Sequence, residues 1–276
     1  GEIKATKPKT IWDDKEINYQ NGRNDIKNLF QNSEIFDFPK PVFYLEKIIT
    51  MFKMNNDIIL DFFSGSATTA HAVMKLNSED DGNRKFICVQ LPETTDEKSE
   101  AYKAGYKNIC EIGKERIRRA GEKVKTESGK DDLDIGFKVL KLDSSNIKSW
   151  DSDFENLETN LFEAVENIKS DRSENDLVYE ILLKYGLDLT LPIEELNING
   201  KKIFSIGFGS LVCCLDNDID TDTVEKIAEL KKQFTNDYGL ESMRVVFKDS
   251  SFKNSVVKTN ALQILKQNGI DEVVSV

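Results

Sequence analysis

A run of small and hydroxylated residues carries the clearest chemical signal in the chain. Ser64-Gly65-Ser66 follows the short apolar stretch 57–61, and Thr68-Thr69 open a segment with helical character. Small side chains let a ligand approach the backbone, and the N–H groups of a first helical turn attract an anionic or polar group. The run predicts a ligand-binding turn. A tight strand-to-helix connection with good capping residues is the structural alternative.

The segments around this run predict the element that positions it. Residues 57–61 and 85–91 are apolar enough for buried strands, and residues 68–76 between them are expected to form a helix. A strand, a helix and a strand this close together make a βαβ unit with parallel strands. Ligands bind such sheets at the carboxyl ends of the strands, which is where the small-residue run falls.

Further helices are predicted before and after this unit. Pro39-Lys40-Pro41 precedes a helical pattern over 42–52, a common signal for a helix start. A long helix is expected over 107–125, with a basic face formed by Lys114, Arg116, Arg118, Arg119, Lys123 and Lys125. A solvated helix face is the plain interpretation of that basic stretch.

The remaining segments predict an α/β fold in two domains, 1–150 and 151–276. The boundary is placed in an acidic stretch, 143–174, that is poor in β-branched residues. Residues 136–142 alternate as a half-buried strand would. The second domain is expected to contain helices over 177–185, 221–234 and 258–267, and strands over 202–206, 211–215, 243–247 and 272–276. The first two of these strands are joined by a hairpin-type turn, Gly207 to Ser210.

Charge and cysteine content narrow the class of protein. The chain has 38 Lys+Arg and 49 Asp+Glu, a net charge of −11, which is opposite to the basic balance of most nucleic-acid-binding domains. Its four cysteines form no Cys-x-x-Cys pair and there is one histidine, so no metal site is expected. Buried, reduced thiols and the lack of a signal peptide or apolar span indicate a cytoplasmic protein.

Two other chemistries are disfavoured. The sole histidine, His71, lies one turn into the helix after the small-residue run, but no Gly-x-Ser-x-Gly elbow supports a Ser-His-Asp arrangement with Ser64 or Ser66. A dinucleotide site would need Gly-x-Gly-x-x-Gly, and the run has only Gly65.

The segment Asp61–Thr69 resembles the Asp-Pro-Phe-x-Gly-x-Gly-Thr-Thr signature of amino-methyltransferases that act on adenine or cytosine in DNA. Phe62 replaces the proline and Ala67 the last glycine. Pro39-Lys40-Pro41 is similar to the Lys-Pro segment that lines the cofactor pocket in this family. Gln90 stands where the family has a ribose-binding acid, with Glu93 as the alternative.

Several further segments resemble the modification subunits of type III restriction-modification systems, in the same order along the chain: 69–74, 89–93, 136–143, 182–186 and 252–261. The resemblance implies a partial Rossmann-like S-adenosylmethionine-dependent methyltransferase core followed by a C-terminal α/β domain. It implies transfer to adenine N6. It implies that the methyl donor is bound by Asp61, Phe63, Ser64, Gly65, Ser66, Thr68, Thr69, Pro39, Lys40 and Gln90.

The family's catalytic motif, (Asp/Asn/Ser)-Pro-Pro-(Tyr/Phe/Trp), does not occur, because no two of the five prolines are adjacent. The type III order of motifs places it in a preceding part of the protein, so no catalytic residue is expected in this sequence. The implied partners are double-stranded DNA, a second modification subunit and the restriction subunit. Two functions stay open for the chain itself: binding the methyl donor, or serving as a non-catalytic interaction or dimerisation module.

Overall fold

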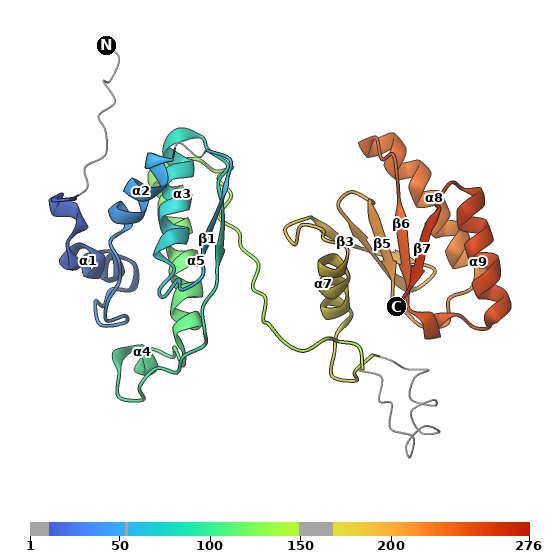
Figure 1. The fold of residues 1–276 in the computed structure, drawn as a ribbon, viewed down its shortest axis with the longest axis horizontal. Coiled ribbons are helices and arrows are strands. Elements are labelled where there is room, and N and C mark those ends of the chain that lie inside the picture. Colours follow the sequence, from blue (N-terminus) through green and yellow to red (C-terminus); the bar gives the residue numbers. More distant parts are fainter. Residues whose placement is uncertain (1–10, 53–54, 149–167) are drawn as a thin grey trace, which may run out of the picture. The chain divides into compact units, whose positions relative to one another are not determined.

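The computed structural model describes residues 11–52, 55–148 and 168–276, which separate into two compact units, 1–137 and 138–276 (Figure 1). The sequence places the domain boundary near residue 150. The two units instead separate between Phe137 and Lys138. Both units mix helices and strands, as predicted for an α/β chain.

The first unit contains the predicted βαβ element. Strand β1 (Ile58–Asp61) pairs in parallel with β2 (Lys85–Cys88), and helix α3 (Thr68–Asp80) connects them. Helix α2 (Val42–Met51) and the long helix α5 (Ile109–Ser128) pack against α3. Helix α1 (Tyr19–Phe30) contacts α5, and the short η1 (Lys15–Ile17) and α4 (Glu100–Lys103) complete the unit.

Among the described residues of the first unit, helices cover one face of the β1–β2 pair. Ile59 and Phe86 pack into a core with α2 and α3, and Cys88 packs into a second core that includes α1 and α5. The alternate residues are exposed: Ile58 and Leu60 on β1 with Phe62 directly after it, and Ile87 on β2 with Val89 and Leu91 after it. In Figure 1 the labelled helices of this unit lie to one side of β1. Because side chains alternate along a strand, this pattern defines an open apolar sheet face.

The second unit contains a five-stranded mixed sheet in the order β3-β4-β5-β6-β7. Strands β3 (Ile193–Ile198), β4 (Lys201–Ile206) and β5 (Leu211–Cys214) are antiparallel neighbours. Strands β6 (Arg244–Phe247) and β7 (Glu272–Ser275) continue the sheet in parallel with β5. The predicted hairpin turn joins β4 to β5, with positive φ at Gly207, Phe208 and Gly209.

Helices cover both faces of this sheet. On one face, helices α8 (Thr221–Tyr238) and α9 (Ser255–Gln267) form a core with Ile203, Val212, Val245 and Phe247. The short η3 (Asp249–Ser251) lies between β6 and α9 in the chain. Helix α7 (Glu174–Lys184) builds the opposite core with Phe204, Cys213 and Val246. Each central strand therefore buries both of its faces.

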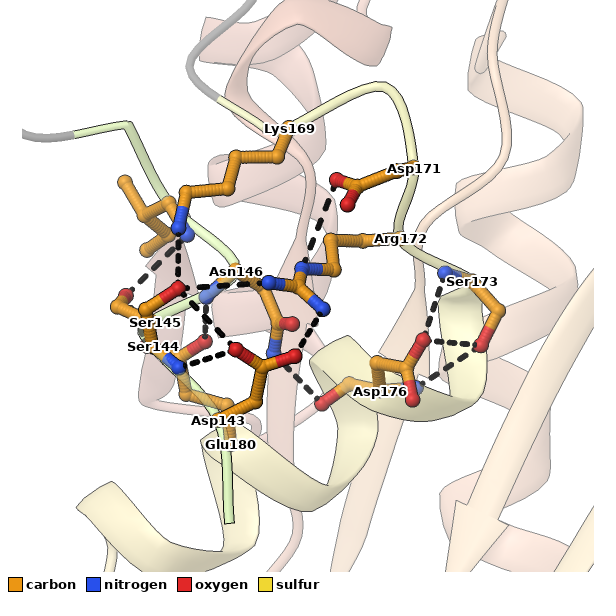
Figure 2. Close-up of polar contacts among 11 residues, drawn as sticks. Asp143, Ser144, Ser145, Asn146, Lys169, Asp171, Arg172, Ser173, Asp176 and Glu180 are labelled. Atoms are coloured by element: carbon orange, nitrogen blue, oxygen red, sulfur yellow. Dashed lines mark hydrogen bonds and ion pairs between the residues drawn. The ribbon is translucent and has the colours of Figure 1, made fainter. Parts of the chain in front are cut away.

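A cluster of polar contacts explains why the second unit begins before residue 150. Arg172 pairs with Asp143 at 2.7 Å, and Ser145 and the Asn146 amide donate to the two carboxylate oxygens of Glu180 at 2.6 and 2.7 Å (Figure 2). Asn146 also donates to the Asp176 carbonyl at 2.9 Å. These contacts attach residues 143–146 to α7 and to Arg172 just before it, and we call this set of contacts the α7 clip.

Two sequence-based expectations for the secondary structure were wrong. Residues 136–142 form no strand and no β-pairing in the part of the chain that the structure describes, and Val139, Leu140 and Leu142 are exposed. Helix α5 does carry the predicted basic residues, but Arg116 is completely buried instead of lying on the exposed face. No helix in the described ranges is long and apolar enough to cross a membrane.

Candidate cofactor-loop site

The small-residue run forms a loop at the carboxyl ends of the two parallel strands. Asp61 ends β1 opposite Cys88, and its carbonyl accepts the Val89 N–H at 2.8 Å. The chain then turns back, so that the Ser64 N–H donates to the Val89 carbonyl at 3.2 Å. Helix α3 begins at Thr68 directly after the turn. We call residues 61–69 the cofactor loop.

Two residues of the loop adopt left-handed backbone conformations. Gly65 has φ +52°, and a Cβ atom there would lie 3.3 Å from the ring of Phe36. Ala67, which stands at the family's last glycine, has φ +59° as the N-cap of α3. A side chain makes that conformation less favourable by roughly 1–2 kcal/mol. Ala67 is accommodated against Gly113 of α5, where an added Cβ would lie 3.6 Å from the Cβ of Ala67.

Side chains from both strand ends hold the loop in shape. The Asp61 carboxylate accepts the Thr69 hydroxyl at 2.5 Å and the Phe63 N–H at 3.3 Å. The side-chain oxygen of Gln90 accepts the Gly65 N–H at 2.7 Å and so helps to fix the loop. The family resemblance implies a ribose contact for Gln90. Its amide nitrogen donates to the Leu91 carbonyl at 3.3 Å, and the alternative, Glu93, is exposed.

The Pro39–Pro41 segment lies beside the start of α3. The Lys40 carbonyl accepts the Thr68 hydroxyl at 3.3 Å, and Asp25 of α1 accepts the Val42 N–H at 2.9 Å. Gly22 of α1 allows this approach, since a Cβ there would lie 2.1 Å from the Pro39 carbonyl oxygen. The segment and the loop are thus neighbours, as the sequence predicts.

The ten predicted site residues divide by exposure. Phe63 and Lys40 are exposed, and Asp61, Ser64, Gly65 and Gln90 are half-buried, so these can reach a ligand. Ser66, Thr68, Thr69 and Pro39 are buried. The accessible residues form a rim of mostly small or polar side chains. The buried residues lie behind the rim and support it.

Arg116 is the residue of this site that sequence reasoning placed wrongly. It lies on α5 with none of its surface exposed, and its Nη1 donates to Ser66 at 2.7 Å and to Thr68 at 2.6 Å. The spacing contained a signal, because Ile112, Gly113, Ile117 and Ala120 form a buried stripe in which position 116 also falls. The other basic residues of α5 with an ion pair, Lys114, Arg118, Arg119 and Lys123, contact glutamates of the same helix.

His71 lies in the buried part of α3, behind the loop. Burial, together with the smaller effect of the charges of Arg116, Lys123 and Lys75, lowers the pKa of His71 to about 3. The imidazole is therefore neutral near pH 7. Its Nδ1 has no hydrogen-bond partner among the described residues, so no described aspartate orients the imidazole through this atom.

The cysteines and acidic residues add no second site. All four cysteines are free, and burial raises the pKa of Cys88, Cys213 and Cys214 to about 12 in each case. Within the described ranges, no group of three or more His, Cys, Asp or Glu side chains is placed to hold a metal ion.

Comparison with known proteins identifies the class to which this loop belongs. Residues 1–121 match the DNA methylase family of N6/N4 enzymes. The N6/N4 DNA methylase match thus lies within the first unit, and the chain is homologous to the Mod subunits of type III restriction-modification systems over much of its length.

Three relatives show the extent of the homology. The Mod subunit of the EcoPI enzyme of Escherichia phage P1 is 30% identical over 92% of this chain and 38% of its own length. The EcoP15I Mod subunit of Escherichia coli is 31% identical over 84% of this chain and 34% of its own. The StyLTI Mod subunit of Salmonella typhimurium is 41% identical over 48% of this chain and 20% of its own. The chain thus spans less than two fifths of each relative.

Proposed function

We propose that this chain is the methyl-donor-binding part of a site-specific DNA adenine-N6 methyltransferase of a type III restriction-modification system. The observation that carries the proposal is the cofactor loop, which combines the family signature with a left-handed Gly65 at the carboxyl end of a parallel strand pair. In this proposal, the first unit is a partial Rossmann-like methyltransferase core.

The residues present fit S-adenosylmethionine. Gly65 leaves space that a side chain would fill, and the loop presents a polar, partly accessible rim at the start of α3. The N-terminus of α3 lies directly behind that rim, and its positive dipole end favours the carboxylate of the donor's methionine part. When bound, the donor supplies an electrophilic methyl group. Asp61, Phe63, Ser64, Gly65, Lys40 and Gln90 would border it, with Ser66, Thr68, Thr69 and Pro39 behind them.

The reaction needs groups that this sequence does not contain. The family's Pro-Pro motif holds a flipped-out adenine whose amino group attacks the methyl group in line, and no adjacent prolines occur here. Methyl transfer to double-stranded DNA would therefore require the complete modification subunit. Pairing with a second modification subunit and with the restriction subunit is part of the same proposal.

Isothermal titration with S-adenosylmethionine tests the proposal. We expect weak, saturable binding, because the apolar face of β1–β2 beside the loop is open. Gly65→Val should abolish this binding through strain at φ +52° and contact with Phe36.

Gly129→Val is the matched control for that variant. Gly129 also has a left-handed φ, +67°, but it ends α5 and has nothing within 4 Å of an added Cβ. A flat titration of the unaltered chain would contradict the proposal and favour the alternative, a non-catalytic interaction or dimerisation module. Equal binding by the Gly65 and Gly129 variants would argue against the loop as the site.

A further inference from the structure

Arg116 is a buried cation directly behind the cofactor loop. None of its surface is exposed, and no described carboxylate is paired with it. Burial lowers the pKa of Arg116 to about 10, with Asp25 as the acid whose charge raises it. The guanidinium therefore keeps its charge near neutral pH. A buried charge without a close counter-ion is unfavourable, so a simple packing role would be served better by an apolar side chain.

The hydrogen bonds of Arg116 are concentrated on the loop. A single nitrogen, Nη1, donates to the hydroxyls of Ser66 and Thr68, while Nε and Nη2 have no partner among the described residues. Ser66 lies between the two left-handed residues, Gly65 and Ala67. The contact thus falls on the part of the loop whose backbone is least favourable by itself.

Arg116 also determines how the Thr68 hydroxyl is used. Since Thr68 Oγ1 accepts from Arg116, its own hydrogen is free to be donated, and it goes to the Lys40 carbonyl at 3.3 Å. Three segments that are distant in sequence are joined through this chain of bonds: α5, the cofactor loop and the Pro39–Pro41 segment. Two of them contain the predicted cofactor-binding residues.

We propose that Arg116 is a positioning residue for the methyl-donor site, an inference that rests on the proposed function of the loop. It holds the loop in its ligand-accepting shape from behind and fixes the loop against the Lys40 segment. It does not touch the ligand. The expectation is that its removal loosens the loop and weakens donor binding beyond what a comparable loss of stability would cause.

Arg84 provides a matched control. It is also a buried arginine of the first unit, 5% exposed, and is hydrogen-bonded to Asp80 and Asn55. Arg84 directly precedes β2, whereas the cofactor loop follows the carboxyl end of β1. Removing the Arg84 guanidinium should destabilise the same unit without reaching the loop.

The experiment compares Arg116→Met with Arg84→Met by hydrogen exchange of the chain without ligand. The Gly65 N–H bonds to Gln90 and the Ala67 N–H bonds to the Ser64 carbonyl, so both report on the loop. We expect Arg116→Met to speed exchange of these amides by about tenfold or more, the size expected for losing hydrogen bonds from a charged group. Arg84→Met should leave them unchanged. Equal effects of both variants, or no effect of Arg116→Met, would overturn the proposal.

Titration of the same variants with S-adenosylmethionine gives a second measurement. Arg116→Met should weaken binding by about tenfold or more, and Arg116→Lys, which keeps the charge and a donor, should restore part of it. Arg84→Met should bind as the unaltered chain does. If the unaltered chain binds no donor, the proposed function fails, while the exchange comparison still decides whether Arg116 holds the loop.

Discussion

The two units solve the burial of a sheet in different ways. In the second unit, β5 is buried along its whole length, with α8 and α9 on one side and α7 on the other. In the first unit, β1 and β2 are covered on one face and expose a row of apolar side chains on the other. The first unit also carries the loop with the methylase signature.

The second unit thus buries its sheet by itself, whereas the first unit leaves one apolar face of its sheet exposed. Monomeric proteins rarely leave a contiguous apolar face exposed, and such faces are typical of sites that another segment or molecule covers. In the first unit the open face adjoins the candidate site through Phe62 and Phe63, which are 65% and 73% exposed. The second unit has five strands, each hydrogen-bonded to a neighbour, and two closed cores.

The largest expected effect is a loss of stability on truncating a side chain in the closed core, compared with one on the open face. Phe247 is fully buried in the second unit, so Phe247→Ala should lower the free energy of unfolding by about 3–5 kcal/mol. Leu60, on the open face, is 59% exposed, and Leu60→Ala should cost less than about 1 kcal/mol. Urea unfolding followed by circular dichroism measures both. Similar losses for the two variants would show that the open face is covered in solution.

An effect of intermediate size is a pH dependence of stability that only the first unit should show through its histidine. His71 is the sole histidine, and its folded pKa of about 3 lies below the ordinary value of 6.5. The unfolded chain therefore binds a proton that the folded unit excludes. The stability that the buried neutral imidazole allows is therefore fully present above pH 6.5. As the pH falls from 6.5 toward 3, the free energy of unfolding decreases by at most about 1.4 kcal/mol per pH unit.

Unfolding experiments between pH 7 and pH 4, with the His71→Leu variant as control, measure this loss. The variant should lack the part of the slope between about pH 6.5 and pH 5, where carboxylates contribute little. Hydrogen exchange should assign the change to helices of the first unit and not to α8. A variant with the same slope as the unaltered chain would contradict the buried neutral imidazole.

The smallest expected effect concerns the α7 clip. Burial raises the pKa of Glu180, but hydrogen bonds from Ser145, Lys184 and the Asn146 amide together lower it to about 2. The carboxylate form therefore stabilises the clip above the ordinary value of 4.5, and this is lost as the pH falls toward 2. Glu180→Gln should cost about 1 kcal/mol at pH 7 and speed exchange of the Asn146 amide.

Glu229 gives the control for that change. It pairs with Lys226 on the exposed face of α8, at a side-chain exposure of 65%, so Glu229→Gln should change stability by less than about 0.5 kcal/mol. An unchanged Asn146 exchange rate in Glu180→Gln would show that the clip does not hold residues 143–146 on α7.

The elements that the sequence predicts well are those with local signals. The βαβ unit follows from two apolar runs and a small-residue turn, and the β4–β5 hairpin follows from Gly207 to Ser210 between apolar runs. The family resemblance implies that the cofactor loop and the Pro39–Pro41 segment line one pocket, and the Thr68 hydroxyl does donate to the Lys40 carbonyl.

The elements that were missed depend on partners distant in sequence. Strand β3 is an edge strand with exposed glutamates, and its pairing with β4 supplies what its composition does not. Residues 136–142 alternate like a strand but have no partner strand. Arg116 was assigned to solvent from its charge, whereas the loop hydroxyls that accept its hydrogen bonds lie about fifty residues earlier. Burial of a charged side chain is determined by such partners, which periodicity alone does not specify.

Binding of the methyl donor at the cofactor loop can be tested by locating a bound donor on the chain. Ultraviolet crosslinking of methyl-labelled S-adenosylmethionine, followed by peptide mapping, does this. We predict label in peptides that contain residues 61–69 or Pro39 and Lys40, and loss of that label in Gly65→Val. Label confined to residues 138–276, or label unaffected by Gly65→Val, would contradict it.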